Sequence, residues 1–267
     1  MQIENLFSVE GKIVLITGGS RGIGEMIAQA FLVNGANVYI SSRKKNDCDN
    51  TAKKLNKECR GDCFSLPEDV SSLGGINNLL ENFKKREKHL DILVNNAGAV
   101  WGEELENFSE QGWDKIMDLN VKSMFFMVKA FLPLLSVKAT RKSPTKIINI
   151  GSIDGINTPT YENYSYSISK AAVHKLTKVL AAKLIKKSII CNAIAPGPFP
   201  SKMLGSAVNH DYGIISEKNP SKRVGQSEDM AGAALFLGSK ASDYIVGDTI
   251  ICDGGLIACA GHDLTNA

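Results

Sequence analysis

Short apolar runs alternate with longer stretches of helical periodicity along the whole chain. The apolar runs predict strands at 12–17, 36–42, 62–66, 91–96, 146–152, 191–196 and 248–253. Helices are predicted between them, over 23–34, 45–58, 72–88, 121–135 and 166–187. This alternation favours right-handed βαβ units wound into one parallel, layered α/β sheet. No repeat or linker interrupts it, so residues 1–267 are predicted to form a single domain.

Two of the predicted helices are more apolar than one core-facing side requires. The helix at 121–135 carries Met, Phe, Val and Leu around most of its circumference, and the helix at 166–187 has an apolar stripe. Packing against the sheet accounts for one face of each helix. The remaining apolar surface predicts contact with a second subunit.

Composition and charge narrow the class of protein. With 43% hydrophobic and 22% charged residues, the chain can build a sizeable core. A net charge of +3 does not indicate a nucleic-acid partner. The six cysteines lack CxxC spacing and nearby His ligands, which argues against a metal site or a disulfide framework. The start has no signal-peptide pattern and no apolar run reaches about 18 residues, so we expect no membrane span and a cytoplasmic protein.

A glycine-rich turn follows the first predicted strand and opens the first helix. Glycine lets the backbone approach a pyrophosphate, and the helix N-terminus presents free N–H groups to the anion. The spacing is GxxxGxG, and its place between strand and helix predicts dinucleotide binding. The residues expected to contact the cofactor in this turn are Gly18, Ser20, Arg21, Gly22, Ile23 and Gly24.

The second strand ends in Ser42 and Arg43, followed by two lysines and no acidic residue. An Asp or Glu there would accept a hydrogen bond from the ribose 2′-hydroxyl and repel a 2′-phosphate. A guanidinium instead forks onto phosphate. Arg43, with Arg21 as a second cation, therefore predicts NADP(H) as the cofactor. The alternative is that these residues form an ordinary solvated basic patch.

Three tyrosines, Tyr161, Tyr164 and Tyr166, crowd one segment, and only Tyr166 has a lysine four residues on, at Lys170. Positions i and i+4 share a helix face, so the ammonium can lie close to the phenol. A fixed cation is expected to lower the phenol pKa from about 10 and make Tyr166 an acid–base catalyst. Such a pair also occurs by chance on many helices.

Further candidates lie where open α/β sheets bind ligands, at the carboxyl ends of strands. Ser152 ends the predicted fifth strand, and its hydroxyl is placed to hold a substrate carbonyl against the phenol. Asn96, Ala97 and Gly98 follow the fourth strand, where small residues let a cofactor approach. Asn120 either caps or interrupts a helix.

Together these motifs resemble the short-chain dehydrogenase/reductase family over nearly the whole chain. The TGGSRGIG turn, NNAG, Ser152, the Tyr166/Lys170 pair and Pro196-Gly197 occur in the family's order and at close to its spacing. The resemblance implies a doubly wound Rossmann-type domain with a mainly seven-stranded parallel sheet, and usually a homotetramer. It also implies a tetrad in which Tyr166 donates the proton, Ser152 orients the carbonyl, Lys170 shifts the Tyr pKa and binds the nicotinamide ribose, and Asn120 holds a water.

The resemblance implies further contacts along the cofactor. These are Asp69 and Val70 beside the adenine, Asn96 to Gly98 along the ribose, and Pro196, Gly197, Phe199 and Ser201 at the nicotinamide. A loop over about 197–219 is expected to cover the substrate. The interval from Ser152 to Tyr166 looks one residue longer than is commonest in the family, which alters this region and leaves the chemistry intact.

Within the family, GSRGIG and the basic residue after the second strand look most like the 3-oxoacyl-(acyl-carrier-protein) reductases of fatty acid biosynthesis. The 196–201 segment and Trp101-Gly102 look similar to the rhamnolipid-associated type. The expected substrate is therefore a small-molecule or acyl-carrier-linked carbonyl, a 3-oxoacyl thioester on ACP or CoA. Trp101, Met203 and Leu204 either line an acyl channel or pack the loop.

Other functions remain open. The same tetrad would serve an NADP-dependent dehydrogenase of a sugar, polyol or other secondary alcohol. A non-catalytic NADPH-sensing protein is disfavoured because both the tyrosine and the lysine are present. A serine hydrolase is disfavoured because Ser152 has no GxSxG context and no histidine has a recognisable triad setting; the histidines are His89, His174, His210 and His262.

Overall fold

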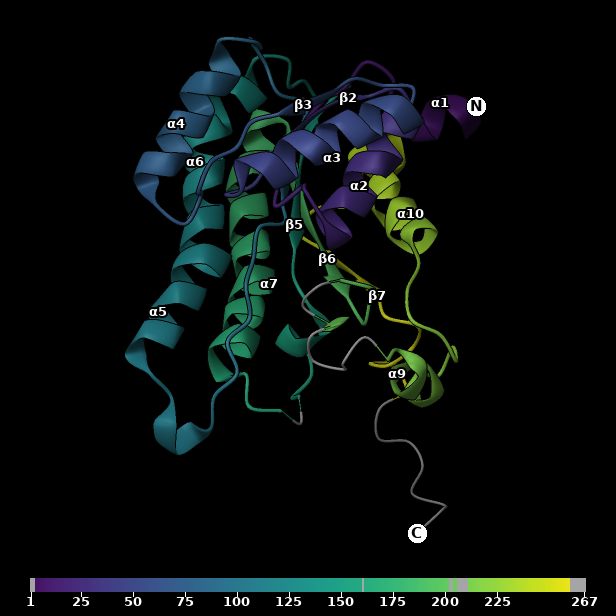
Figure 1. The fold of residues 1–267 in the computed structure, drawn as a ribbon. Coiled ribbons are helices and arrows are strands. Elements are labelled where there is room, and N and C mark those ends of the chain that lie inside the picture. The colour runs from purple at the N-terminus through teal and green to yellow at the C-terminus, as the bar shows by residue number, and fades with distance from the viewer. Residues whose placement is uncertain (1–2, 160, 202–203, 206–210, 260–267) are drawn as a thin grey trace.

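The computed structural model describes residues 3–159, 161–201, 204–205 and 211–259. Within them, seven parallel strands form one sheet in the order β3-β2-β1-β4-β5-β6-β7 (Figure 1). The strands are β1 (Ile13–Thr17), β2 (Asn37–Ser41), β3 (Cys63–Ser65), β4 (Ile92–Asn95), β5 (Thr145–Ile150), β6 (Ile189–Pro196) and β7 (Thr249–Cys252). The predicted parallel, seven-stranded α/β sheet is confirmed.

Helices cover both faces of the sheet, because the central strands are apolar on both sides. Val14 and Ile16 of β1 face α2 (Gly22–Val33), α3 (Lys45–Glu58) and α10 (Ser227–Gly238) in one core cluster. Leu15 of the same strand faces α4 (Leu73–Lys84), α6 (Ser123–Ser136) and α7 (Tyr164–Leu184) in the other. Shorter α-helices among the described residues are α1 (Ile3–Phe7), α5 (Glu110–Met117) and α9 (Gly213–Lys218).

Predicted and observed boundaries differ most around two helices. The helix predicted at 72–88 ends at Lys84, where Arg86 and Glu87 turn back to donate to Phe83 O. The helix predicted at 121–135 begins much earlier, because Ser109 caps α5 by accepting a hydrogen bond from Gly112 N. The chain then continues through a π-helical turn, Asp118–Lys122, into α6.

This continuous helical stretch, Glu110–Ser136, has the length and hydropathy of a membrane span. Half of its most apolar 18-residue segment is buried inside the protein. Burial of that kind is typical of a core helix, so length and hydropathy alone are weak grounds for a membrane span.

The order of the strands determines where a ligand is expected. From β1 the chain builds outward through β2 and β3 on one side, and through β4 to β7 on the other. In open α/β sheets, ligands bind outside the carboxyl ends of the strands at such a point of reversal. The carboxyl ends of β1 and β4 are therefore the expected centre of the site.

Candidate active site

The turn between β1 and α2 requires glycine at two positions. Gly22 has a φ of +54°, in the left-handed region that residues other than glycine rarely adopt. A Cβ on Gly24 would lie 2.2 Å from Gly18 O. No side chain caps the N-terminus of α2. The turn thus brings bare backbone and free helix N–H groups to the sheet edge, as a pyrophosphate requires.

The end of β4 holds the glycine turn in place. Asn96 Nδ2 donates to the carbonyls of Thr17 and Gly18 at 3.0 and 3.1 Å. Thr17 Oγ1 accepts from the backbone N–H groups of Asn96 and Ala97 at 3.1 and 3.0 Å. The side chain of Asn96 therefore stabilises the turn, which is a structural role that the sequence did not reveal.

Two buried hydroxyls and an arginine lie at the end of β2. The buried hydroxyls of Ser41 and Ser42 have no hydrogen-bond partner among the described residues. The exposed Arg43 beside them lines a cavity of about 120 Å³. Its other lining residues are Ser71, Ala99, Lys115, Asp118 and Leu119. The cavity thus brings the guanidinium of Arg43 and the ammonium of Lys115 together with the carboxylate of Asp118, and Lys115 is a cation that the sequence did not reveal.

The other predicted cofactor residues have different surroundings. Asp69 Oδ1 accepts from Ser71 N at 3.0 Å, which places the carboxylate at the turn into α4. Ser201 lies across from the glycine turn, 3.3 Å from where a Cβ on Gly22 would be. The side chains of Val70 and Phe199 are buried in the two core clusters. Those two residues therefore offer mainly their backbone to a ligand.

Of the three clustered tyrosines, only Tyr166 lies with the other predicted catalytic groups. Its phenol interacts with the Ser152 hydroxyl, and Lys170 Nζ lies 5.5 Å from the centre of its ring. Tyr161 instead donates to Asp154 Oδ2 at 2.7 Å, and Tyr164 donates to Glu162. The structure therefore singles out Tyr166 by its surroundings.

The pKa of Tyr166 does not follow the sequence-based prediction. This pKa is raised to about 12, mainly by burial and also by the Asp154 carboxylate, whereas the Ser152 hydroxyl opposes the rise. The predicted lowering by Lys170 is wrong for this structure because burial of the phenol dominates. A phenol with so high a pKa remains protonated at neutral pH.

Lys170 is buried and has a specific partner. Its ammonium donates to the main-chain oxygen of Ile150, at the end of β5, at 2.9 Å. Burial lowers the pKa of Lys170 to about 8, although the Asp154 carboxylate acts in the opposite direction. This lysine therefore exchanges protons within reach of neutral pH.

Asn120 lies in the π-helical turn and is fully buried. Its Nδ2 donates to Ala99 O at 2.9 Å and to Ser169 Oγ at 3.0 Å, and its Oδ1 accepts from Ala99 N at 2.9 Å. The residue thus interrupts the helix rather than capping it, and ties it to the segment after β4. Both hydrogens of the Asn120 amide are donated to these partners. The predicted water would therefore have to bind another atom of Asn120.

Ser152 lies two residues beyond β5, and a histidine missed by the sequence analysis holds its backbone. The His174 Nε2 atom is 2.9 Å from Ser152 O, and Nδ1 is 3.3 Å from Thr249 Oγ1 in β7. Because a carbonyl only accepts, Nε2 carries the hydrogen. Burial lowers the pKa of His174. The ring contacts the carbonyl and not the hydroxyl of Ser152, so this pair is not a nucleophile and its base.

A buried polar chain runs beneath the site. Asn95 Nδ2 donates to Asn149 Oδ1 at 2.9 Å, and Asn149 Nδ2 donates to Thr177 Oγ1 at 3.0 Å. All three side chains are at most 1% exposed. They link β4, β5 and α7, so they fix the helix that carries Tyr166 against the sheet. In the sequence, these buried polar residues could have been recognised by the asparagines that stand inside otherwise apolar strands.

The residues considered for an acyl channel have different surroundings. Trp101 Nε1 donates to Glu103 Oε2 at 2.9 Å, and Lys115 Nζ lies 4.7 Å from the centre of the indole ring. Trp101 therefore packs against α5, which favours the packing interpretation. Leu204 is half-buried, and Met203 lies outside the described residues.

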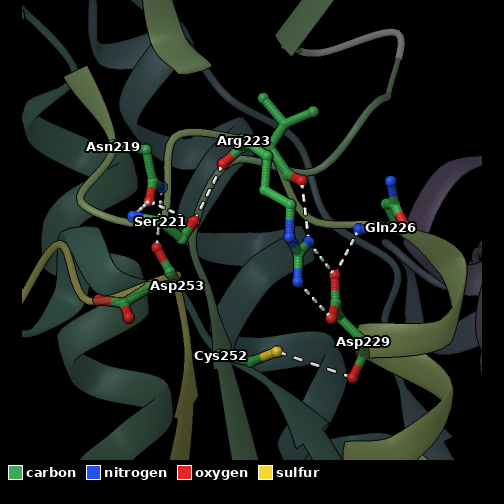
Figure 2. Close-up of polar contacts among 8 residues, drawn as sticks. Asn219, Ser221, Arg223, Gln226, Asp229, Cys252 and Asp253 are labelled. Atoms are coloured by element: carbon green, nitrogen blue, oxygen red, sulfur yellow. Dashed lines mark hydrogen bonds and ion pairs between the residues drawn. The ribbon is translucent and has the colours of Figure 1, made fainter. Parts of the chain in front are cut away.

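A cavity of about 350 Å³ lies against Pro198 and Phe199, beside the segment after β6. Figure 2 shows the polar contacts that line it. Arg223 Nη2 donates to Asp229 Oδ1 at 2.9 Å, and Asn219 Nδ2 donates to Asp253 O at 3.0 Å. The cavity contains none of the four predicted catalytic residues. Its walls brace the turn that follows β6.

The chain matches one family model and resembles several known proteins closely. The model, described as enoyl-(acyl carrier protein) reductase, matches residues 18–257. The rhamnolipids biosynthesis 3-oxoacyl-[acyl-carrier-protein] reductase of Pseudomonas aeruginosa is 43% identical, over 93% of this chain and 97% of that protein. The 2-dehydro-3-deoxy-D-gluconate 5-dehydrogenase of Escherichia coli is 34% identical, over 96% of this chain and 99% of that protein.

A solved structure agrees with the fold in detail. It is the Pseudomonas aeruginosa RhlG/NADP active-site complex, which superposes with a TM-score of 0.90 at 43% identity. The match covers 96% of this chain and 99% of that one. The likeness therefore extends over the whole sheet and both helical layers.

Proposed function

The chain belongs to the short-chain dehydrogenase/reductase family, as an NADP-dependent oxidoreductase, and from this premise we propose that it reduces 3-oxoacyl thioesters to 3-hydroxyacyl thioesters. The observation that carries the proposal is the Tyr166 phenol, which faces the Ser152 hydroxyl with a buried lysine beside its ring. This group lies at the same sheet edge as the glycine turn. A proton donor next to a dinucleotide crevice is what carbonyl reduction requires.

Reduction of a ketone needs a hydride at carbon and a proton at oxygen. Bound NADPH supplies the hydride. Ser152 donates a hydrogen bond to the substrate oxygen and aligns it with the phenol. Tyr166, whose pKa is about 12, holds its proton until negative charge develops on that oxygen, and then donates it.

The other two residues of the tetrad support this transfer. Lys170 stabilises the phenolate left behind, and its pKa of about 8 lets it pass a proton toward the phenol. Asn120 holds the water that connects Lys170 to solvent. Arg43, Arg21 and the Ser42 hydroxyl bind the 2′-phosphate, while the turn from Gly18 to Gly24 holds the pyrophosphate.

The remaining cofactor contacts follow the same pattern. The segment from Asn96 to Gly98 lies along the ribose, and a Cβ on Gly98 would be 3.7 Å from Lys170 Nζ. Asp69 and Val70 lie beside the adenine, and the segment from Pro196 to Ser201 binds the nicotinamide. We propose one Rossmann-type domain over 1–267 and a substrate-covering loop over about 197–219, of which 202–203 and 206–210 lie outside the described residues.

The substrate class is proposed from the relatives. The Pseudomonas aeruginosa protein at 43% identity is named as a 3-oxoacyl-[acyl-carrier-protein] reductase. The Escherichia coli sugar-acid dehydrogenase at 34% supports the alternative of a sugar or polyol substrate. The higher identity favours the thioester, carried on ACP or CoA, and with it a place in fatty acid synthesis.

We also propose a cytoplasmic homotetramer. Phe125 on α6 is 43% exposed, and Ile168 and Val179 on α7 are 47% and 48% exposed. Apolar side chains on two neighbouring helices support a symmetric interface. All six cysteines are free, as in a reducing compartment. A monomeric mass by light scattering at micromolar concentration would refute the assembly.

The test of function is a steady-state comparison of substrates. We expect acetoacetyl-CoA with NADPH to give the highest kcat/KM in a panel that includes sugar acids, polyols and simple secondary alcohols, each with NADPH or NADP⁺ and with NADH or NAD⁺. Faster turnover of a sugar acid than of any thioester would establish the alternative instead.

A further inference from the structure

One carboxylate near the catalytic pair is not used by the proposed chemistry. Asp154 lies in the short turn Ile153–Gly155, two residues after Ser152. Its backbone N–H donates to Ser152 Oγ at 3.1 Å. The side chain is half-buried, at the sheet edge where Ser152 meets the phenol.

The carboxylate is fixed by neighbouring side chains. Tyr161 Oη donates to Asp154 Oδ2 at 2.7 Å, and Asn163 Nδ2 donates to the same oxygen at 3.2 Å. Asn163 is 2% exposed and accepts from Ser167 Oγ, on the first turn of α7, at 2.7 Å. Both donors reach Oδ2, so the described residues give Oδ1 no hydrogen bond. The charge therefore stays at one position relative to the helix that carries Tyr166.

The field of this carboxylate reaches the reacting groups. Asp154 raises the pKa of both Tyr166 and Lys170. A negative charge that acts on the phenol must also act on a substrate whose carbonyl lies against that phenol. The site thus carries a built-in electrostatic bias.

Other charged groups lie close to Asp154 and the phenol. The ammonium of Lys170 is 4% exposed and donates to Ile150 O. It lies 5.5 Å from the centre of the Tyr166 ring, so its positive charge opposes that of Asp154. Burial lowers the pKa of His174, which favours the neutral ring. Glu162, which accepts from Tyr164, is exposed and adds negative charge. Asp154 is therefore the half-buried carboxylate beside the catalytic pair, and removing its charge isolates its contribution.

We propose that Asp154 makes this site select against substrates that carry a negative charge close to the reacting carbonyl. The inference rests on the proposed function and narrows its substrate class. A 3-oxoacyl thioester is neutral around its ketone, whereas a free 3-oxo acid carries a carboxylate two bonds from it. In a partly screened site, two like charges that lie within about 6 Å of each other change an equilibrium by roughly three- to a hundredfold.

Acetoacetate and ethyl acetoacetate test this directly, because they share one ketone and differ in charge. With NADPH bound, we would measure kcat/KM for both probes. Calorimetric titration of each probe into the enzyme with NADP⁺ bound, which has no hydride to transfer, gives their dissociation constants independently of turnover. The wild-type enzyme is expected to prefer the ester. Asp154→Asn is expected to raise the acetoacetate-to-ester ratio by about tenfold in both measurements.

Two further variants separate charge from position. Tyr161→Phe removes one hydrogen bond to Asp154 and retains the carboxylate, so the ratio should stay near the wild-type value. Glu58→Gln makes the same change of net charge on an exposed side chain at the far end of α3, and it should leave the ratio unchanged.

The outcomes separate this inference from the proposed function. An unchanged ratio in Asp154→Asn, an equal change in Glu58→Gln, or a wild-type preference for acetoacetate would overturn the role of Asp154. An enzyme that shows the expected ratios and does not reduce 3-oxoacyl thioesters would overturn the proposed function alone. A thioester reductase with an unchanged ratio in Asp154→Asn would overturn the role of Asp154 alone.

Discussion

The glycine turn after β1 and the first turn of α7 lie at the same sheet edge. The first presents mainly backbone, and the second presents mainly side chains. In the turn, residues close in sequence supply bare backbone, and a Cβ on Gly24 would clash with Gly18 O at 2.2 Å. Around α7, side chains from distant segments meet, and burial shifts the pKa values of Tyr166 and Lys170 in opposite directions. The first region holds an anion by shape, whereas the second controls protons through its environment.

This contrast predicts that substitutions in the two regions will separate binding from turnover, with Lys170 as the exception. Lys170→Ala removes an ammonium assigned to both the phenol and the nicotinamide ribose. We expect kcat to fall by about 10²–10⁴-fold and NADPH affinity to fall as well. Stopped-flow turnover and fluorescence titration measure the two effects.

The exposed Lys175, on the same helix, provides the matched control. Lys175→Ala should retain both turnover and affinity. If Lys170→Ala lost turnover with an unchanged NADPH dissociation constant, the lysine would belong to the catalytic region alone.

Arg43 tests the binding region by itself. A charge-assisted contact to phosphate contributes about 1.5–3 kcal/mol, so Arg43→Asp should reduce the preference for NADPH over NADH by about 10- to 100-fold. The ratio of the two dissociation constants measures this preference. Arg141→Asp, on an exposed loop before β5, should leave the ratio unchanged. Equal affinity of the wild-type protein for both cofactors would contradict the assignment of Arg43.

The same contrast explains what the sequence could predict. The glycine turn and the residues after β2 are local, so their pattern indicated both the dinucleotide site and the preference for NADP(H). The alternation of strands and helices likewise predicted the sheet. The direction of the Tyr166 pKa could not be predicted, because it depends on burial by segments far away in sequence. His174 and Lys115 were missed because their partners, Ser152, Thr249 and Arg43, become neighbours only in the folded chain.

Titration of His174, in the catalytic region, makes the stability of the protein depend on pH. Its pKa is lowered in the folded protein, so the unfolded chain binds more protons below about pH 6.5. Stability is therefore lost as the pH falls from that value, by at most about 1.4 kcal/mol per pH unit for this one group. His174→Gln keeps a donor for Ser152 O and removes the titration.

Urea unfolding at pH 7.5 and pH 5.5 measures the difference. The variant should lose less stability than the wild-type protein between the two values. An equal loss in both proteins would show that His174 does not titrate in this range on unfolding.

The smallest effect is expected at Tyr164, two residues before the proposed catalytic tyrosine. Its hydroxyl donates to Glu162 at the surface and contacts no member of the tetrad. Tyr164→Phe should change kcat by less than about twofold and stability by less than about 0.5 kcal/mol. A steady-state assay and a thermal melt measure the two quantities. A large loss of turnover would contradict the assignment of Tyr166 as the proton donor.

Tyr166→Phe tests the central claim, that one region of the site binds the cofactor and the other supplies the proton. The substitution removes only the phenol oxygen and retains the ring beside Lys170. NADPH titration and turnover of acetoacetyl-CoA in the same sample give both quantities. We predict a kcat at least about 10²-fold lower with an unchanged NADPH dissociation constant. Turnover near that of the wild-type protein would contradict the account.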